Sequence, residues 1–112
     1  MECTSCCVEN NTVVIKVTGR LDAMSAGDFE KECGRCIDQG RRCVILDLLE
    51  LEYISSAGLR SILVMGKQLK AKGGTLLFGP MSKMVKEVFD ISGFATIFPV
   101  HASMEKALEA VA

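Results

Sequence analysis

The chain of 112 residues carries 13 Lys and Arg against 14 Asp and Glu, a formal net charge of −1. Nucleic-acid binding depends on an excess of basic residues, so this balance argues against a nucleic-acid partner. Hydrophobic residues make up 49% of the chain and charged residues 24%, as in a packed globular domain. No apolar run approaches the ~20 residues that cross a bilayer, and the N-terminus lacks the pattern of a secretion signal. We therefore expect one cytoplasmic domain over residues 1–112, without membrane insertion.

The first third of the chain predicts a strand followed by a helix. Val13–Val17 is a β-branched run that ends at Gly19, and strand-like residues around Cys6–Val8 precede it. A helix begins at Ser25, because Asp28 follows at the spacing of a capping box. Apolar residues recur at helical spacing along one face of this helix: Ala26, Phe29, Cys33, Cys36 and Ile37.

The middle of the chain predicts a buried strand and a basic amphipathic helix. The nearly continuous apolar run Val44–Leu49 is typical of a strand that is covered on both faces. Beyond Tyr53 and Ile54, two serines precede the helix, which ends at the glycine pair Gly73–Gly74. Its apolar positions are Leu59, Ile62, Leu63, Gly66 and Leu69.

The last third predicts a short strand over Thr75–Phe78, a helix that Ser82 caps and that ends near Gly93, a strand over Ala95–Phe98, and a helix from Ser103. Strands and helices thus alternate along the chain with short connections. Such alternation requires right-handed crossovers and a mostly parallel sheet. The expected fold class is α/β, with a small, mostly parallel (mixed) β-sheet flanked by about four α-helices.

The six cysteines leave a metal or redox protein open as an alternative. Cys3 with Cys6 and Cys33 with Cys36 have the spacing of zinc ligands. Redox enzymes place such a pair at a helix N-terminus, whereas Cys33 and Cys36 come late in the predicted helix, where the dipole raises a thiol pKa. Without an export signal, we expect reduced thiols, Cys7 included, and no metal or cofactor.

No assembled catalytic site is recognisable, so we expect a protein that is not an enzyme. His101, the only histidine, lacks the partner pattern of acid–base catalysis and is expected at the surface. Gly73–Gly74 lacks the Lys-Ser or Lys-Thr of a phosphate-binding loop. Glu50 and Glu52 are expected in a turn as solvated charges.

The segment Leu46–Leu59 combines a buried strand, a short turn and two serines where the basic helix begins. One of these serines can simply cap the helix. The free N–H groups and positive dipole end at this position can also accommodate a phosphate. Because a phosphate adds about −1.5 to −2 charges, a partner that docks on this helix end would respond to its addition.

Three segments of the chain, Gly19–Asp22, Leu46–Leu48 and Tyr53–Leu59, resemble successive motifs of STAS domains. This family comprises the anti-sigma factor antagonists and their relatives in sulfate transporters. The resemblance runs from about Thr12 to the end of the chain and is close to the stand-alone bacterial antagonists. It implies a small sheet flanked by helices, in agreement with the pattern above.

In those antagonists the strand-to-helix turn reads approximately Asp-Ser-Ser/Thr-Gly-Leu, and the serine after the aspartate accepts a phosphate. The resemblance therefore implies that Ser56 is the phosphoacceptor here. Ser55 replaces the aspartate and is a rival acceptor, and Ala57 replaces the second hydroxyl residue. The residues expected at the partner surface are Asp22, Ser55, Ser56, Ala57, Gly58 and Arg60.

The family also implies partner switching. An unmodified antagonist binds an anti-sigma factor that is a serine kinase and so frees the sigma factor. Phosphorylation of the serine ends that complex, and a serine phosphatase resets the antagonist. A second interpretation is a STAS subunit that docks on an ABC lipid-transport or stress-signalling complex, and a third is the cysteine-based metal or redox protein. The sequence points to no particular oligomeric state.

Overall fold

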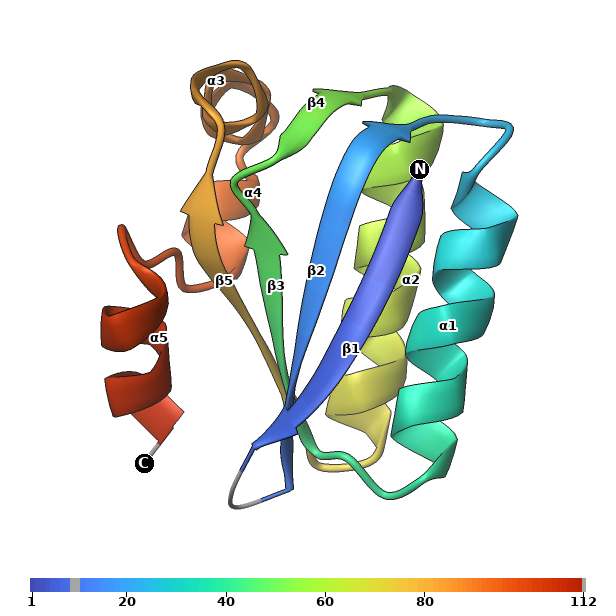
Figure 1. Ribbon diagram of the computed structural model, residues 1–112, viewed down its shortest axis with the longest axis vertical. Coiled ribbons are helices and arrows are strands. Elements are labelled where there is room, and N and C mark those ends of the chain that lie inside the picture. The colour runs from blue at the N-terminus through green and yellow to red at the C-terminus, as the bar shows by residue number, and fades with distance from the viewer. Residues whose placement is uncertain (9–10, 112) are drawn as a thin grey trace.

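The structure is a computed structural model that describes residues 1–8 and 11–111 (Figure 1). Five strands form in this part of the chain: β1 (Glu2–Val8), β2 (Thr12–Leu21), β3 (Cys43–Leu48), β4 (Leu51–Ile54) and β5 (Thr75–Met81). Five helices form in the same part: α1 (Ala26–Asp38), α2 (Ser56–Ala71), α3 (Lys83–Ser92), α4 (Phe94–Ile97) and α5 (Met104–Val111). The mixed sheet with flanking helices confirms the predicted α/β fold class.

Strand β2 organises the sheet because it pairs with three other strands. It runs antiparallel to β1, its first half (Thr12–Lys16) runs parallel to β3, and its end (Gly19–Leu21) runs parallel to β4. Strand β5 adds to the far side of β3, also in parallel. The change of partner along β2 brings the ends of β2 and β4 together where α1 and α2 begin (Figure 1).

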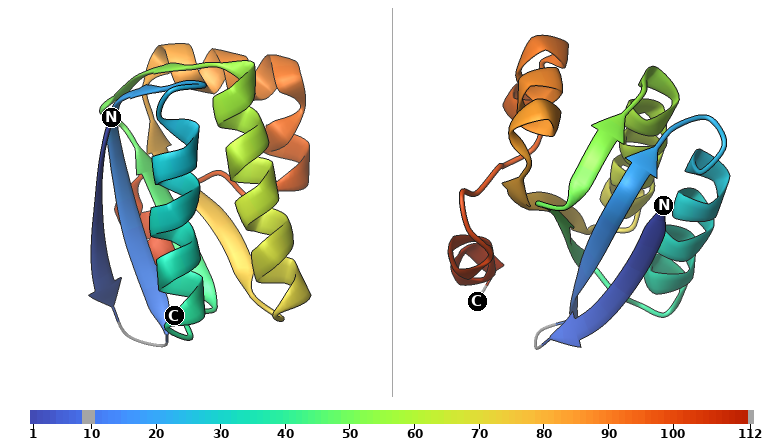
Figure 2. Two further views of the ribbon diagram at one scale, coloured as in Figure 1. Left: turned by 90° about the vertical axis from the view of Figure 1, so that its right-hand side faces the viewer. Right: turned by 45° about the horizontal axis from the view of Figure 1, so that its top comes forward.

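Helices cover both faces of the sheet. Helices α1 and α2 lie together on one face, α5 lies on the other, and α3 packs against β4 (Figure 2). The main core fills the space under α1 and α2, where Val13, Ile15 and Val17 point inward at the period of two expected for a strand. A smaller cluster around Ile45, Leu77 and Ala107 lies beneath α5.

The strand predicted over Ala95–Phe98 is wrong, since these residues belong to α4 and the turn that follows it. The rings of Phe94 and Phe98 lie 6.0 Å apart, and they contact Phe89 and Phe78 at 5.4 and 5.6 Å. In a strand, residues four apart would lie about 13 Å from each other. The helical turn is therefore what lets both rings reach the same part of the core.

The segment after β3 also differs from the prediction. The apolar strand ends at Leu48 rather than Leu49, whose side chain is 56% exposed in a turn. Glu50 lies in this turn as expected, and its carboxylate pairs with Lys16. Glu52, however, belongs to the separate strand β4, which the sequence pattern did not reveal.

His101 is half-buried rather than at the surface. Its backbone N–H donates to the carbonyl oxygen of Phe78 at 2.9 Å, which extends the edge of β5 by one bridge at Val100. Its Nε2 atom is buried and has no hydrogen-bond partner among residues 1–8 and 11–111. The bridge explains the burial, because it draws the loop after α4 against the sheet.

Candidate functional site at the start of α2

Ser55 is the N-cap of α2, and each of its polar groups forms a hydrogen bond. Its Oγ accepts from the N–H of Gly58 at 3.2 Å, its own N–H donates to the carbonyl oxygen of Leu21 at 2.9 Å, and its carbonyl oxygen accepts from the N–H of Leu59 at 2.9 Å. The residue is half-buried. Ser55 therefore connects the end of β2 to the first turn of α2.

Ser56 is the first residue of α2 and is exposed. Its hydroxyl forms no hydrogen bond with any residue that the structure describes. The position next to a satisfied cap leaves this hydroxyl in solvent, at the positive end of the helix dipole. Of the two serines, Ser56 is thus the one with a free side chain.

Gly58 is buried where α2 packs directly on the strand ends. A Cβ atom at this position would lie 2.6 Å from the carbonyl oxygen of Leu21 and 2.9 Å from Cγ1 of Ile54. Both distances are far shorter than ordinary contacts, so only glycine allows this close approach. Ala57, between the free serine and this glycine, is half-buried.

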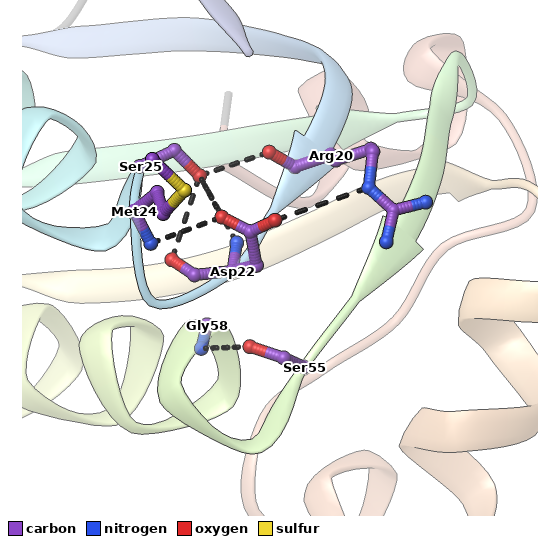
Figure 3. Close-up of polar contacts among 6 residues, drawn as sticks. All are labelled: Arg20, Asp22, Met24, Ser25, Ser55 and Gly58. Atoms are coloured by element: carbon purple, nitrogen blue, oxygen red, sulfur yellow. Dashed lines mark hydrogen bonds and ion pairs between the residues drawn. The ribbon is translucent and has the colours of Figure 1, made fainter.

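The loop between β2 and α1 is ordered by Asp22 and Ser25 (Figure 3). The Asp22 carboxylate accepts from the N–H of Met24 at 3.1 Å, while Ser25 Oγ accepts from the N–H of Asp22 at 3.0 Å and donates to the carbonyl oxygen of Arg20 at 2.9 Å. Ser25 is the N-cap of α1 as predicted, but the capping box with Asp28 does not form, because these loop contacts engage its hydroxyl.

Arg20 adds a cation beside this loop. Its guanidinium lies 4.2 Å from the centre of the Tyr53 ring, a cation–π contact made possible by the pairing of β2 with β4. It also lies 3.9 Å from the Asp22 carboxylate. Met24, at the tip of the loop, is 95% exposed.

The structure brings together the residues that the sequence analysis singled out. The bond between Ser55 and Leu21 places Asp22, which follows Leu21, at the same corner of the molecule as the start of α2 (Figure 3). Arg60 follows one turn along α2 and is exposed. We name this corner the junction surface, which consists of Asp22, Ser55, Ser56, Ala57 and Arg60. Gly58, which was also expected at the partner surface, is instead buried beneath it.

Arg20, Met24, Ser25 and Tyr53 were not among the predicted site residues. The Arg20–Tyr53 contact depends on the pairing of β2 with β4, and β4 was not predicted as a strand. Met24 carried no signal, since an apolar residue in a loop has no periodic pattern to reveal its exposure. The local signal that the sequence did offer was the pair Asp22 and Ser25, since both residue types form hydrogen bonds to nearby backbone groups in loops.

The cysteines lie apart from the junction surface. Cys33 and Cys36 are buried on α1, and burial is the main reason that their thiol pKa values are raised. Burial also raises the pKa of the Cys3 thiol, to about 11. The predicted direction is confirmed, although burial rather than the helix dipole causes it. Among the described residues, no three His, Cys, Asp or Glu side chains gather to hold a metal ion, and no helix has the length and apolar character needed to span a membrane.

Comparison with known proteins agrees with the geometry. The sequence model of the STAS domain matches residues 7–107. The chain belongs to the STAS domain family. Among curated STAS relatives, Bordetella bronchiseptica BtrV, which is named as an anti-sigma factor antagonist, is 46% identical over 82% of this chain and 79% of its own. The anti-sigma-B factor antagonist of Bacillus subtilis is 26% identical over 88% of this chain and 90% of its own.

Solved structures share the STAS fold. A Thermotoga maritima protein, described as an anti-sigma factor antagonist, has a TM-score of 0.90 at 21% identity, covering 97% of this chain and 93% of its own. The Bacillus cell fate determinant SpoIIAA, solved in its phosphorylated form, has a TM-score of 0.78 at 25% identity, covering 99% of this chain and 100% of its own. The overall fold is therefore that of the family.

Proposed function

We propose that this STAS protein is an anti-sigma factor antagonist that phosphorylation of Ser56 switches off. The names of its curated relatives support the first part of this proposal. The observation that carries the second part is the exposed Ser56 hydroxyl, free of hydrogen bonds to the described residues at the first position of α2. SpoIIAA, whose structure was solved in a phosphorylated form, adds support for such a modification in the family.

Ser55, the rival acceptor, is disfavoured by its contacts. Its hydroxyl already accepts the Gly58 N–H, and the residue is half-buried. Phosphorylation there would break the cap, whose loss costs about 1 kcal/mol, and would bring a dianion against the end of β2. At Ser56 the same group would meet solvent and the positive end of α2.

In the unmodified state the junction surface binds the anti-sigma factor, which is also the serine kinase. Ser55 and Gly58 hold the start of α2 in place, while Asp22, Ser56, Ala57 and Arg60 meet the partner. In the kinase reaction the Ser56 Oγ attacks the γ-phosphorus of ATP, ADP leaves, and the hydroxyl proton passes to a base of the kinase. The protein itself acts as substrate and binding partner, and it supplies no catalytic residue.

The added charge of about −1.5 to −2 then opposes docking, because the partner surface fits a neutral hydroxyl. A serine phosphatase hydrolyses the phosphate ester and restores the binding state. We propose that this cycle takes place in the cytoplasm, where anti-sigma factors meet their sigma factors, and that one domain over residues 1–112 performs it. Neither a metal nor a cofactor of this chain takes part.

The test is phosphate transfer from the cognate kinase and ATP, followed by the intact mass. We expect the mass of one phosphate group to be added to the unmodified protein and to Ser55→Ala, and to be absent from Ser56→Ala. Transfer that survives in Ser56→Ala would contradict the assignment of the acceptor. A complete lack of transfer, together with stable binding to an ABC or stress-signalling complex, would replace the proposal by constitutive docking.

A further inference from the structure

The outer face of α2 presents an exposed residue on each turn beyond Ser56, beginning with Arg60 and continuing with Val64 and Lys67. The helix contains no acidic residue. The Arg60 guanidinium forms neither an ion pair nor a hydrogen bond with any residue in 1–8 or 11–111. A cation with a free side chain therefore stands one turn beyond the exposed serine.

The spacing of Ser56 and Arg60 is that of neighbours on a helix surface. Side chains four residues apart lie on the same face, and each leans toward the helix N-terminus. The Cα–Cβ bond of Arg60 therefore tilts toward the turn that holds Ser56, which puts that turn within reach of its long side chain. A pair with the anion on the N-terminal side and the cation four residues later is the favourable order.

A phosphate suits the guanidinium of Arg60 in particular. It offers three acceptor oxygens, and the planar guanidinium can donate to two of them at once. Arg20 is the other arginine beside the junction surface, but its guanidinium already stacks on Tyr53 near the Asp22 carboxylate. Arg60 is thus the better placed of the two to receive a new anion on Ser56.

We propose, resting on the proposed function, that Arg60 is the intramolecular partner of the phosphate on Ser56. In the unmodified protein the guanidinium is free to meet acidic groups of the binding partner. Phosphorylation adds a dianion and, in the same event, draws Arg60 into an ion pair along α2. The junction surface therefore loses an available cation as well as gaining negative charge.

The experiment uses phosphoserine installed at position 56 by genetic encoding, so that it needs neither kinase nor partner. The second pKa of the phosphate is followed by ³¹P NMR in the phosphorylated forms of the unsubstituted protein, Arg60→Gln and Lys67→Gln. We expect this pKa to be about 0.3 higher in Arg60→Gln than in the unsubstituted protein, and unchanged in Lys67→Gln, which lies two turns further on. About 1 M salt should shrink the difference.

Equal pKa values in the unsubstituted protein and Arg60→Gln would overturn the inference. An equal rise in Lys67→Gln would also overturn it, since the effect would then come from net charge alone. Arg60 is exposed, so both variants should fold, and Arg60→Lys should keep part of the effect as a point charge. Phosphate transfer to Ser56 with no effect of Arg60 on the phosphate pKa would overturn this inference and leave the proposed function standing. Failed transfer by the kinase would overturn the proposed function on which the inference rests.

Discussion

The Oγ atom of Ser55 accepts a hydrogen bond from the backbone N–H of Gly58 at 3.2 Å. This contact gives a physical account of the serine that replaces an aspartate in the motif, since serine and aspartate are both good N-caps. The replacement keeps the start of α2 in place and removes one negative charge beside Ser56. The two adjacent hydroxyls consequently have different surroundings, one bonded to the helix and one in solvent.

The N-cap hydrogen bond of Ser55 should contribute measurably to the free energy of unfolding. Ser55→Ala should lower the free energy of unfolding by about 1 kcal/mol, because the Gly58 N–H loses its acceptor. Ser55→Asp should keep the stability that Ser55→Ala loses, since a carboxylate also caps the helix and interacts favourably with its dipole. Urea denaturation of the three proteins tests both effects. Equal stability of Ser55→Ala and the unsubstituted protein would mean that the cap contributes nothing.

Gly58 should not tolerate a methyl group. Gly58→Ala brings a Cβ within 2.6 Å of the Leu21 carbonyl oxygen and should destabilise the protein by about 1–3 kcal/mol. Gly34→Ala on α1 is the matched control, because nothing lies within 4 Å of its Cβ, and alanine there should stabilise by about 0.5–1 kcal/mol. Thermal unfolding of both variants gives the comparison. A Gly58→Ala protein as stable as Gly34→Ala would contradict the close packing of α2.

A negative charge at position 56 should weaken binding to the anti-sigma factor without unfolding the protein. Ser56→Asp should weaken binding to the anti-sigma factor at least tenfold, or about 1.4 kcal/mol. Its melting temperature should change by no more than about 2 °C, since an acidic residue is favourable in the first turn of a helix. Ala110→Asp, exposed on α5, adds the same charge outside the junction surface and should bind normally. Parallel loss of binding and stability would indicate a structural role for Ser56.

Met24 should contribute to the partner interface through its apolar side chain. It is 95% exposed and its N–H bonds to the carboxylate of Asp22, so truncation should remove contact area without disturbing the fold. We expect Met24→Ala to weaken anti-sigma factor binding about tenfold. Ile91→Ala, at an 89% exposed position on α3, should leave binding unchanged. Calorimetric titration would reject this role if the two variants bound equally well.

We predict that the free energy of unfolding falls in alkali, because burial raises the pKa of thiols in the folded chain. Burial, aided by the nearby Glu32 carboxylate, raises the pKa of Cys3 from 9.0 to about 11, and burial also raises that of Cys33. Between pH 9 and 11 the unfolded chain releases thiol protons that the folded chain keeps, so the free energy of unfolding falls as pH rises. Urea denaturation under reducing conditions measures this fall.

The variant Cys3→Ala should lose less stability than the unsubstituted protein over the same pH range. Cys6→Ala is the control, because Cys6 is exposed on the same strand. An identical fall in Cys3→Ala and the unsubstituted protein would show that the Cys3 thiol titrates alike in the folded and unfolded chains.

Local patterns predicted the elements whose contacts are local or periodic. The strand predicted from the β-branched run Val13–Val17, the Ser82 cap of α3 and the end of α3 at Gly93 agree with the structure, because each depends on residues within a few positions. Ala95–Phe98 failed because contacts with Phe78 and Phe89, distant in sequence, decide its conformation. Strand β4 escaped notice because four residues are too few to show a period.

At the site, the sequence identified the segment that holds the two serines, but not which serine caps α2 and which keeps a free hydroxyl. Either serine could have been the cap, since a shift of one residue satisfies the same pattern. The close fit of Gly58 against Leu21 decides the register, and that fit is a contact between segments far apart in the chain. The same holds for Ser25, whose hydroxyl bonds to the Arg20 carbonyl oxygen rather than to its own helix.

The hydrogen bond from Ser55 to Leu21 and the fit of Gly58 fasten the backbone beneath Ser56 to the sheet. A group added to the Ser56 oxygen has no hinge to move, so the on and off forms should share one fold. Under the proposed switch, the phosphate ester alone distinguishes the two states, and the phosphorylated state lasts until a phosphatase hydrolyses the ester. The rate of switching would then be set by the kinase and the phosphatase rather than by a slow rearrangement of the chain.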